Sequence, residues 1–165
     1  MALLSAPAAA QPPRADAQHK FDAASLKHPE RILAYVHTTW GSNGPAVLLM
    51  HGWGGARAQM TGFVDPLLFA GYRVVAFDQP GHGESDGKTT NLLEIAPTMD
   101  LVAQHEGPFH AVIAHSFGTL ITSYALVERG FPPPTRLVYF GAFNRLLDSL
   151  PRFQVLANLP DEIMD

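Results

Sequence analysis

The hydrophobic residues of this chain fall into short runs that are separated by glycine- and proline-rich turns. Four of the runs are apolar at nearly every position, and they cover residues 47–50, 73–77, 109–114 and 135–140. Such continuous apolar runs are typical of strands that are buried on both faces of a parallel sheet. The pattern over residues 32–38 alternates instead, which predicts a strand near the edge of the sheet.

Apolar residues at helical spacing lie between these strands and predict helices over residues 59–70, 92–102 and 117–129. Pro97 either begins the second helix or occupies its interior, where a proline costs about 3 kcal/mol. A chain in which strands and helices alternate builds right-handed crossovers and a parallel sheet. The predicted fold class is therefore α/β, with a mostly parallel sheet in which the strand at 109–114 is central, helices on both faces and three layers in the order αβα.

Three of the predicted strands are followed by segments that are rich in glycine, histidine and serine. These segments cover residues 51–55, 78–85 and 115–118. The carboxyl ends of parallel strands lie at one edge of a sheet, and open α/β sheets bind their ligands there. We therefore expect the three segments to meet at one rim and to form the functional site.

The segment around Ser116 has the spacing of a nucleophile elbow. Ala114 and Gly118 flank Ser116 two residues on either side, where strand and helix pass too close for larger side chains. The first small residue is an alanine, whereas the common pattern has glycine there. Such a turn strains the serine backbone, exposes the hydroxyl and offers the amides of a helix N-terminus to a developing oxyanion. The alternative is a serine in an ordinary turn between strand and helix.

Composition excludes several other classes of function. The chain has 165 residues, a net charge of −4 and no cysteine. The acidic balance gives no basic surface for nucleic acid, and the missing cysteines exclude thiolate nucleophiles and disulfides. No apolar run is long enough to span a membrane. No histidine pair has the spacing of metal ligands, so we expect neither a metal nor another cofactor.

The three segments together resemble the α/β-hydrolase fold family, over about residues 32–141. Residues 51–55 read His-Gly-Trp-Gly-Gly and are similar to the oxyanion loop of the family. Residues 78–85 read Asp-Gln-Pro-Gly-His-Gly-Glu-Ser and are similar to its loop of the pattern Asp-x-Pro-Gly-His-Gly-x-Ser. Residues 114–118 read Ala-His-Ser-Phe-Gly and match its elbow.

The resemblance implies a role for each of these segments. Ser116 is the expected nucleophile, and the backbone N–H groups of Trp53 and Phe117 are the expected oxyanion hole. The expected oxyanion loop and rim contain His51, Gly52, Gly54, His82 and His115. A serine nucleophile disfavours the epoxide-hydrolase and dehalogenase branches, which use aspartate. The resemblance therefore implies a serine esterase-like hydrolase of the lysophospholipase or serine-aminopeptidase-like branch, acting on a small ester or amide.

The catalytic acid and base have no clear candidates in this sequence. The family places both beyond its cap region, after the later strands, whereas this chain stops at Asp165. None of the eight histidines is a convincing base, and Asp148 is an equally weak acid. We therefore expect an inactive N-terminal fragment or a truncated product. The alternative is a non-catalytic interaction module, and an in-frame continuation that carries a late Asp and His would decide between the two.

The sequence predicts three regions along the chain. Residues 1–30 are an expected N-terminal arm, partly disordered; residues 31–143 are the core, and residues 144–165 begin a truncated cap. The arm lacks the basic start of a signal peptide, which favours a cytoplasmic location. Because the strand at 135–140 is apolar over residues 137–140, we expect self-association through an exposed sheet edge.

Overall fold

The computed structural model describes residues 17–21 and 35–142 of the chain. The predicted start of the cap, including Asp148, lies outside the described residues, as does most of the predicted arm. Within that arm, residues 17–21 form a strand that the hydrophobic pattern did not predict.

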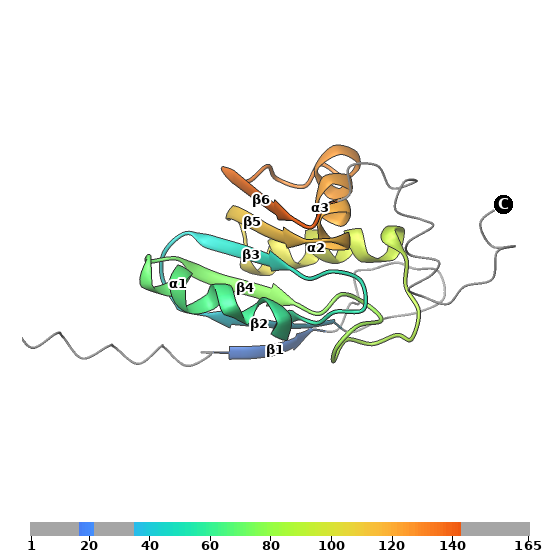
Figure 1. Cartoon of the computed structure of the whole chain (residues 1–165), viewed down its shortest axis with the longest axis horizontal. Helices are drawn as coiled ribbons and strands as arrows, with labels where there is room; N and C mark the ends of the chain where they lie inside the picture. The colour runs from blue at the N-terminus through green and yellow to red at the C-terminus, as the bar shows by residue number, and fades with distance from the viewer. Residues whose placement is uncertain (1–16, 22–34, 143–165) are drawn as a thin grey trace, which may run out of the picture.

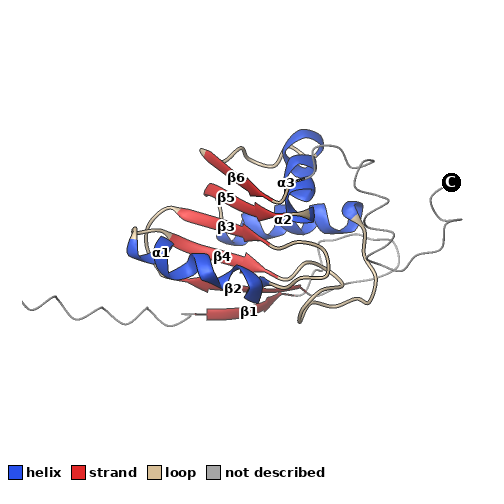
Figure 2. Cartoon of the chain, viewed as in Figure 1, coloured by secondary structure: helices blue, strands red, loops and turns tan. Residues whose placement is uncertain are grey.

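A six-stranded sheet forms the middle layer of the molecule (Figures 1 and 2). The strand order is β1-β2-β4-β3-β5-β6, and β2 alone runs against the others. The bounds are β1 Ala17–Phe21, β2 Tyr35–Trp40, β3 Ala46–Met50, β4 Arg73–Phe77, β5 Phe109–His115 and β6 Arg136–Phe140. The predicted parallel pairing is therefore confirmed, and β2 lies second from one edge. The expected burial is wrong for β6, which is mostly exposed because it lies at one end of the described strand order.

The position of β5 differs from the prediction in one respect. We expected the strand before Ser116 to be central, but it lies second from the β6 edge of the described sheet, and β4 and β3 occupy the middle. Strand order depends on crossovers between distant segments, which a local apolar pattern does not encode. Two parallel strands, β3 and β6, nevertheless flank β5.

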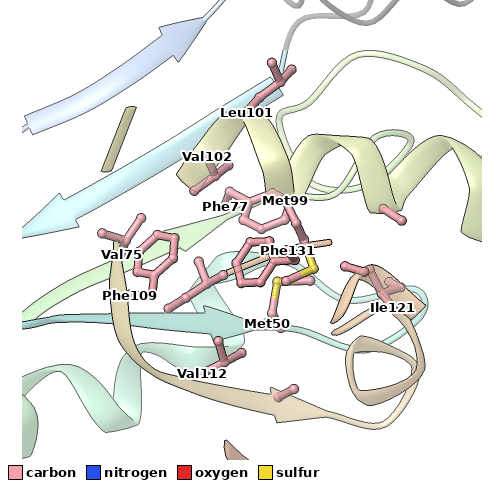
Figure 3. Packing of buried hydrophobic residues seen from close by; sticks show 14 of the residues in the cluster. Met50, Val75, Phe77, Met99, Leu101, Val102, Phe109, Val112, Ile121 and Phe131 are labelled. Carbon is pink, nitrogen blue, oxygen red and sulfur yellow. The ribbon is translucent and has the colours of Figure 1, made fainter. Parts of the chain in front are cut away.

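Alternate residues of the strands supply two apolar layers, one on each face of the sheet. Leu48, Val75 and Val112 belong to the layer beneath helices α2 (Leu92–Glu106) and α3 (Phe117–Glu128), which Figure 3 shows from close by. Their neighbours in sequence point to the other face, toward α1 (Val64–Phe69) and the preceding 3₁₀ helix η1 (Arg57–Phe63). The short buried runs therefore produce the predicted three layers.

Two proline residues change the predicted helices. The single helix expected over residues 59–70 is instead η1 followed by α1, with Pro66 in the first turn of α1, where its missing N–H is tolerated. Pro97 lies in the interior of α2, which begins at Leu92. The side chain of Asn91 caps that helix by accepting hydrogen bonds from the backbone N–H groups of Leu93 and Glu94 at 2.9 and 3.1 Å.

Helix α3 passes unusually close to the end of β3. A Cβ atom placed on Gly118 would lie 2.6 Å from the carbonyl oxygen of His51 and 3.0 Å from that of Met50. Backbone atoms cannot yield in the way that a flexible side chain can. The close approach of α3 therefore requires glycine at position 118.

A buried polar cluster ties α2 to the sheet at Glu106. The Glu106 carboxylate pairs with the Arg73 guanidinium at the start of β4 and, at 3.0 Å, with Nε2 of the fully buried His37 on β2. Burial acts to raise the pKa of this carboxyl, but the hydrogen bond and charge of His37 and the charge of Arg73 outweigh burial and lower the pKa. The ionised form of Glu106 therefore stabilises the fold.

Replacing Gly118 with alanine should destabilise the fold by about 1–3 kcal/mol, because the methyl group overlaps backbone oxygens. Gly62 provides a matched control, since a Cβ placed there meets no atom within 4 Å. Gly62→Ala should be neutral or stabilise by up to about 1 kcal/mol. Urea unfolding of the two variants measures both values, and equal stabilities would contradict the close approach.

The Glu106 cluster should make the free energy of unfolding depend on pH in the acidic range. Because the folded pKa of Glu106 is lowered, its contribution is fully present above the unfolded value of about 4.3 and is lost as pH falls through the folded pKa. Glu106→Gln should cost about 1–3 kcal/mol at pH 7 and flatten the stability profile below pH 5. Asp100→Asn in the same helix breaks only the more exposed pair with Arg129 and should cost less than about 1 kcal/mol. Denaturant melts over this pH range test both expectations.

Candidate active site

Ser116 lies at the corner between β5 and α3 with a strained backbone. Its φ and ψ angles are 50° and −118°, and within the described residues it is the one non-glycine with positive φ. Such a conformation costs on the order of 1–3 kcal/mol and persists only where the surroundings enforce it. Hydrogen bonds hold both sides of the corner: the Ser116 N–H donates to the Phe140 carbonyl at 3.0 Å, and its own carbonyl accepts from Thr119 N–H at 2.9 Å.

The glycine-rich segment after β3 lies directly against this corner. A Cβ atom placed on Gly52 would be 3.1 Å from Cβ of Ser116 and 3.1 Å from Nδ1 of His115. The chain then turns, with Gly55 N–H donating to the Gly52 carbonyl at 3.1 Å and Gly54 at a φ of 68°. The structure therefore brings together two of the segments that the sequence predicted to meet.

The ring of Trp53 contacts two other aromatic rings, those of Phe117 and His82, next to the Ser116 corner. The Trp53 ring is 45% exposed and contacts the Phe117 ring edge-on, with centroids 5.1 Å apart. The Trp53 ring also contacts the ring of His82, with centroids 5.3 Å apart. Phe117 is the first residue of α3, so its N–H has no partner within the helix. That the N–H groups of Trp53 and Phe117 face one point beside Ser116 stays a prediction.

His51 is a buried structural residue with both ring nitrogens engaged. Its Nε2 accepts a hydrogen bond from the Gln79 N–H at 3.1 Å, and its Nδ1 therefore carries the proton and donates to the Gly52 carbonyl at 2.8 Å. Burial lowers the pKa of His51, and the nearby His82 lowers it further, against the opposing effects of the Gly52 hydrogen bond and the Asp78 charge. A neutral ring with no spare lone pair shapes the loop and is unsuited to act as a base.

The loop that follows β4 is fastened by the buried carboxylate of Asp78. This carboxylate accepts hydrogen bonds from the backbone N–H groups of Arg57 at 2.6 Å and Glu84 at 2.9 Å, and it pairs with the Arg57 guanidinium. Ser85 Oγ donates to the Asp78 carbonyl at 2.6 Å and accepts from Val36 N–H at 2.8 Å. The Asp78 carboxylate therefore caps backbone N–H groups of its own loop and of η1.

The structure changes the view of His82 taken from the sequence. The sequence placed His82 at the rim of the site, but its side chain is buried, and its Nδ1 lies 3.1 Å from the Pro80 carbonyl oxygen. Its ring packs between those of His51 and Trp53. Because Nδ1 is the donor in this contact, Nε2 is the ring nitrogen that remains for chemistry.

The His115 side chain packs against the neighbouring strand β6. Its ring stacks on that of Phe140 in the adjacent strand, with centroids 4.8 Å apart and planes 21° apart. Within residues 17–21 and 35–142, no histidine is hydrogen-bonded to the Ser116 hydroxyl. The described part of the chain therefore supplies the corner and the loops around it, without a paired base.

Sequence reasoning missed Arg57 and Gln79, which hold the site together. Arg57 bonds Asp78, Glu84 and Thr38, whereas the Gln79 side-chain amide donates to the His51 carbonyl at 2.7 Å. A buried aspartate requires cationic or N–H partners. That requirement was the signal by which the sequence could have indicated a partner such as Arg57 for Asp78. The described residues contain neither a cluster of three metal-ligating side chains nor a helix suited to span a membrane.

Comparison with solved structures supports the fold. An esterase from Exiguobacterium antarcticum is 20% identical with a TM-score of 0.68, over 84% of this chain and 55% of its own. A proline iminopeptidase-related protein from Thermus thermophilus is 22% identical with a TM-score of 0.66, over 90% and 54%. A probable hydrolytic enzyme from Pseudomonas aeruginosa is 25% identical with a TM-score of 0.63, over 85% and 49%.

This chain therefore spans about half the length of these solved structures. None of the curated proteins compared with it matches. The model of the alpha/beta hydrolase family matches residues 46–164, which include the corner at Ser116 and both loops beside it. The chain belongs to the alpha/beta hydrolase family.

Proposed function

We propose that Ser116 is the nucleophile of a serine hydrolase that cleaves carboxylic esters or amides, with esters favoured. The observation that carries this proposal is the strained backbone of Ser116 at the strand–helix corner, with Gly52 packed against its Cβ. Backbone strain of this kind persists only where the surrounding structure enforces it, and strained residues are common at functional sites. Membership of the alpha/beta hydrolase family supports hydrolysis in general.

The proposed reaction begins when Ser116 Oγ attacks the carbonyl carbon of the substrate and its proton passes to a base. The carbonyl oxygen becomes an oxyanion, which the backbone N–H groups of Trp53 and Phe117 stabilise. Collapse of this intermediate expels the alcohol or amine, which takes up the proton, and leaves an acyl group on Ser116. Water then attacks the acyl carbon and gives a proton to the base. Collapse of this second intermediate releases the carboxylic acid, and Ser116 Oγ takes the proton back from the base.

We further propose that the base lies outside the described residues and that the isolated 165-residue chain turns over little substrate. Three observations support this proposal: both ring nitrogens of His51 are engaged, the His115 ring is stacked on Phe140, and no described histidine is hydrogen-bonded to the Ser116 hydroxyl. Without a base, a serine hydroxyl is a weak nucleophile near neutral pH.

Hydrolysis of a p-nitrophenyl ester by the isolated chain should stay near the residual level of a triad enzyme that lacks one member. That level is roughly 10³–10⁴-fold above the reaction in water, and it comes from the oxyanion hole and substrate binding. Ser116→Ala should change this rate little, because a serine without a base adds little. Ser42→Ala, in the exposed turn before β3, is the matched control and should leave the rate unchanged.

A much faster rate that Ser116→Ala abolishes would show that this chain contains its own base. His82 would then be the first histidine to replace, because its ring lies beside Trp53. A rate no greater than that of buffer alone, from a folded chain, would favour the alternative of a non-catalytic interaction module.

A further inference from the structure

Trp53 carries the one large side chain of the glycine-rich turn at residues 52–55, where Gly52, Gly54 and Gly55 surround it. Close contacts leave little room for other side chains. A Cβ atom on Gly52 would lie 3.1 Å from Ser116 Cβ, and one on Gly55 would lie 2.9 Å from the Gly52 carbonyl oxygen. A Cβ atom on Gly54 would meet no atom of the described residues within 4 Å. The turn therefore presents a single ring and leaves room next to it at Gly54.

Two rings from different elements hold the Trp53 ring in its orientation. Phe117, the first residue of α3, meets it at 86° with centroids 5.1 Å apart, and His82 meets it at 83° and 5.3 Å. His82 is itself buried, and Phe117 packs against the hydrophobic core. Edge-on ring pairs contribute about 0.5–1.5 kcal/mol beyond the burial of their area. The protein itself therefore sets the orientation of the Trp53 ring, without a ligand.

The ring pair of Trp53 and Phe117 lies next to the proposed nucleophile. Trp53 directly follows Gly52, which packs against the Cβ atom of Ser116, and Phe117 directly follows Ser116 itself. Tryptophan side chains are highly buried on average, but Trp53 is 45% exposed at this place. A ligand group that contacts the exposed part of this ring therefore also lies beside Ser116.

We propose that Trp53 is the specificity-determining residue of this site and binds an aromatic group of the substrate. The inference rests on the proposed function of Ser116, and it narrows the substrate class to esters and amides that carry an aromatic ring close to the carbonyl group. An aromatic ring gains offset or edge-on contact with the Trp53 ring, whereas a saturated group of the same size gains only the burial of its area. Trp53 thus serves the carbonyl oxygen through its main chain and the aromatic group through its side chain.

Binding of two matched ketones to the full chain tests this subsite without requiring turnover. Acetophenone has a phenyl ring on its carbonyl carbon, cyclohexyl methyl ketone has a saturated ring of similar size there, and neither can be hydrolysed. The chain contains two tryptophans, so isotope-labelled tryptophan gives one indole N–H signal in NMR for Trp53 and one for Trp40, at the end of β2. Acetophenone should shift the Trp53 signal saturably and leave the Trp40 signal unchanged. Its affinity should be about 2–10 times that of the cyclohexyl ketone.

Trp53→Leu should abolish the preference for the aromatic ketone, while it keeps the backbone N–H that the hydrolysis proposal uses. Trp53→Phe retains a ring and should keep part of the preference, and an unchanged Trp40 signal verifies the fold of each variant. Phe69→Leu is the matched control: Phe69 is 95% exposed at the end of α1, and this variant should bind both ketones like the original chain. Equal affinities of the original chain for the two ketones, or a preference that survives Trp53→Leu, would overturn the inference.

The outcome can be separated from a failure of the proposed function. Ser116→Ala removes the proposed nucleophile and should leave the preference for acetophenone unchanged, since binding of a ketone requires no ester cleavage. An aromatic preference that depends on Trp53, in a chain that never hydrolyses esters, would support the subsite and count against the nucleophile. Hydrolysis that requires Ser116 without any aromatic preference would refute the subsite and leave the nucleophile in place.

Discussion

The structure depends on the close approach of helix α3 to strand β3 at Gly118. Because no side chain separates them, the helix begins close to the end of β3, and the chain enters it through the strained conformation of Ser116. The same approach sets the Gly52 backbone against the Ser116 side chain. One steric constraint therefore fixes the corner and the loop beside it, whatever chemistry they perform.

Two buried networks hold the neighbouring loops in place. Neutral His51 joins the segment after β3 to that after β4 through Gln79, and Asp78 joins the latter to η1 through Arg57. Buried polar groups are costly unless they are paired, and here both ring nitrogens of His51 and both carboxylate oxygens of Asp78 have partners. These hydrogen bonds fasten both loops, and the Trp53 side chain remains 45% exposed above them.

The sequence predicted the features that depend on local patterns. Apolar runs indicated the four parallel strands, and the spacing of Ala114, Ser116 and Gly118 indicated the strained corner. Features that depend on distant contacts were missed: β1 has a polar sequence, the place of β5 follows from strand order, and Arg57 reaches Asp78 across 21 positions. The burial of His82 was missed for the same reason, because its neighbours His51 and Trp53 come from another loop.

A crystal structure of the chain would test the central claim most directly, through the geometry at Ser116. The account predicts a φ near +50° at Ser116, with its N–H bonded to the Phe140 carbonyl and the N–H groups of Trp53 and Phe117 directed to one point beside its hydroxyl. A Ser116 with ordinary helical angles inside α3 and a buried hydroxyl would contradict the account, because neither strain nor an accessible nucleophile would then remain.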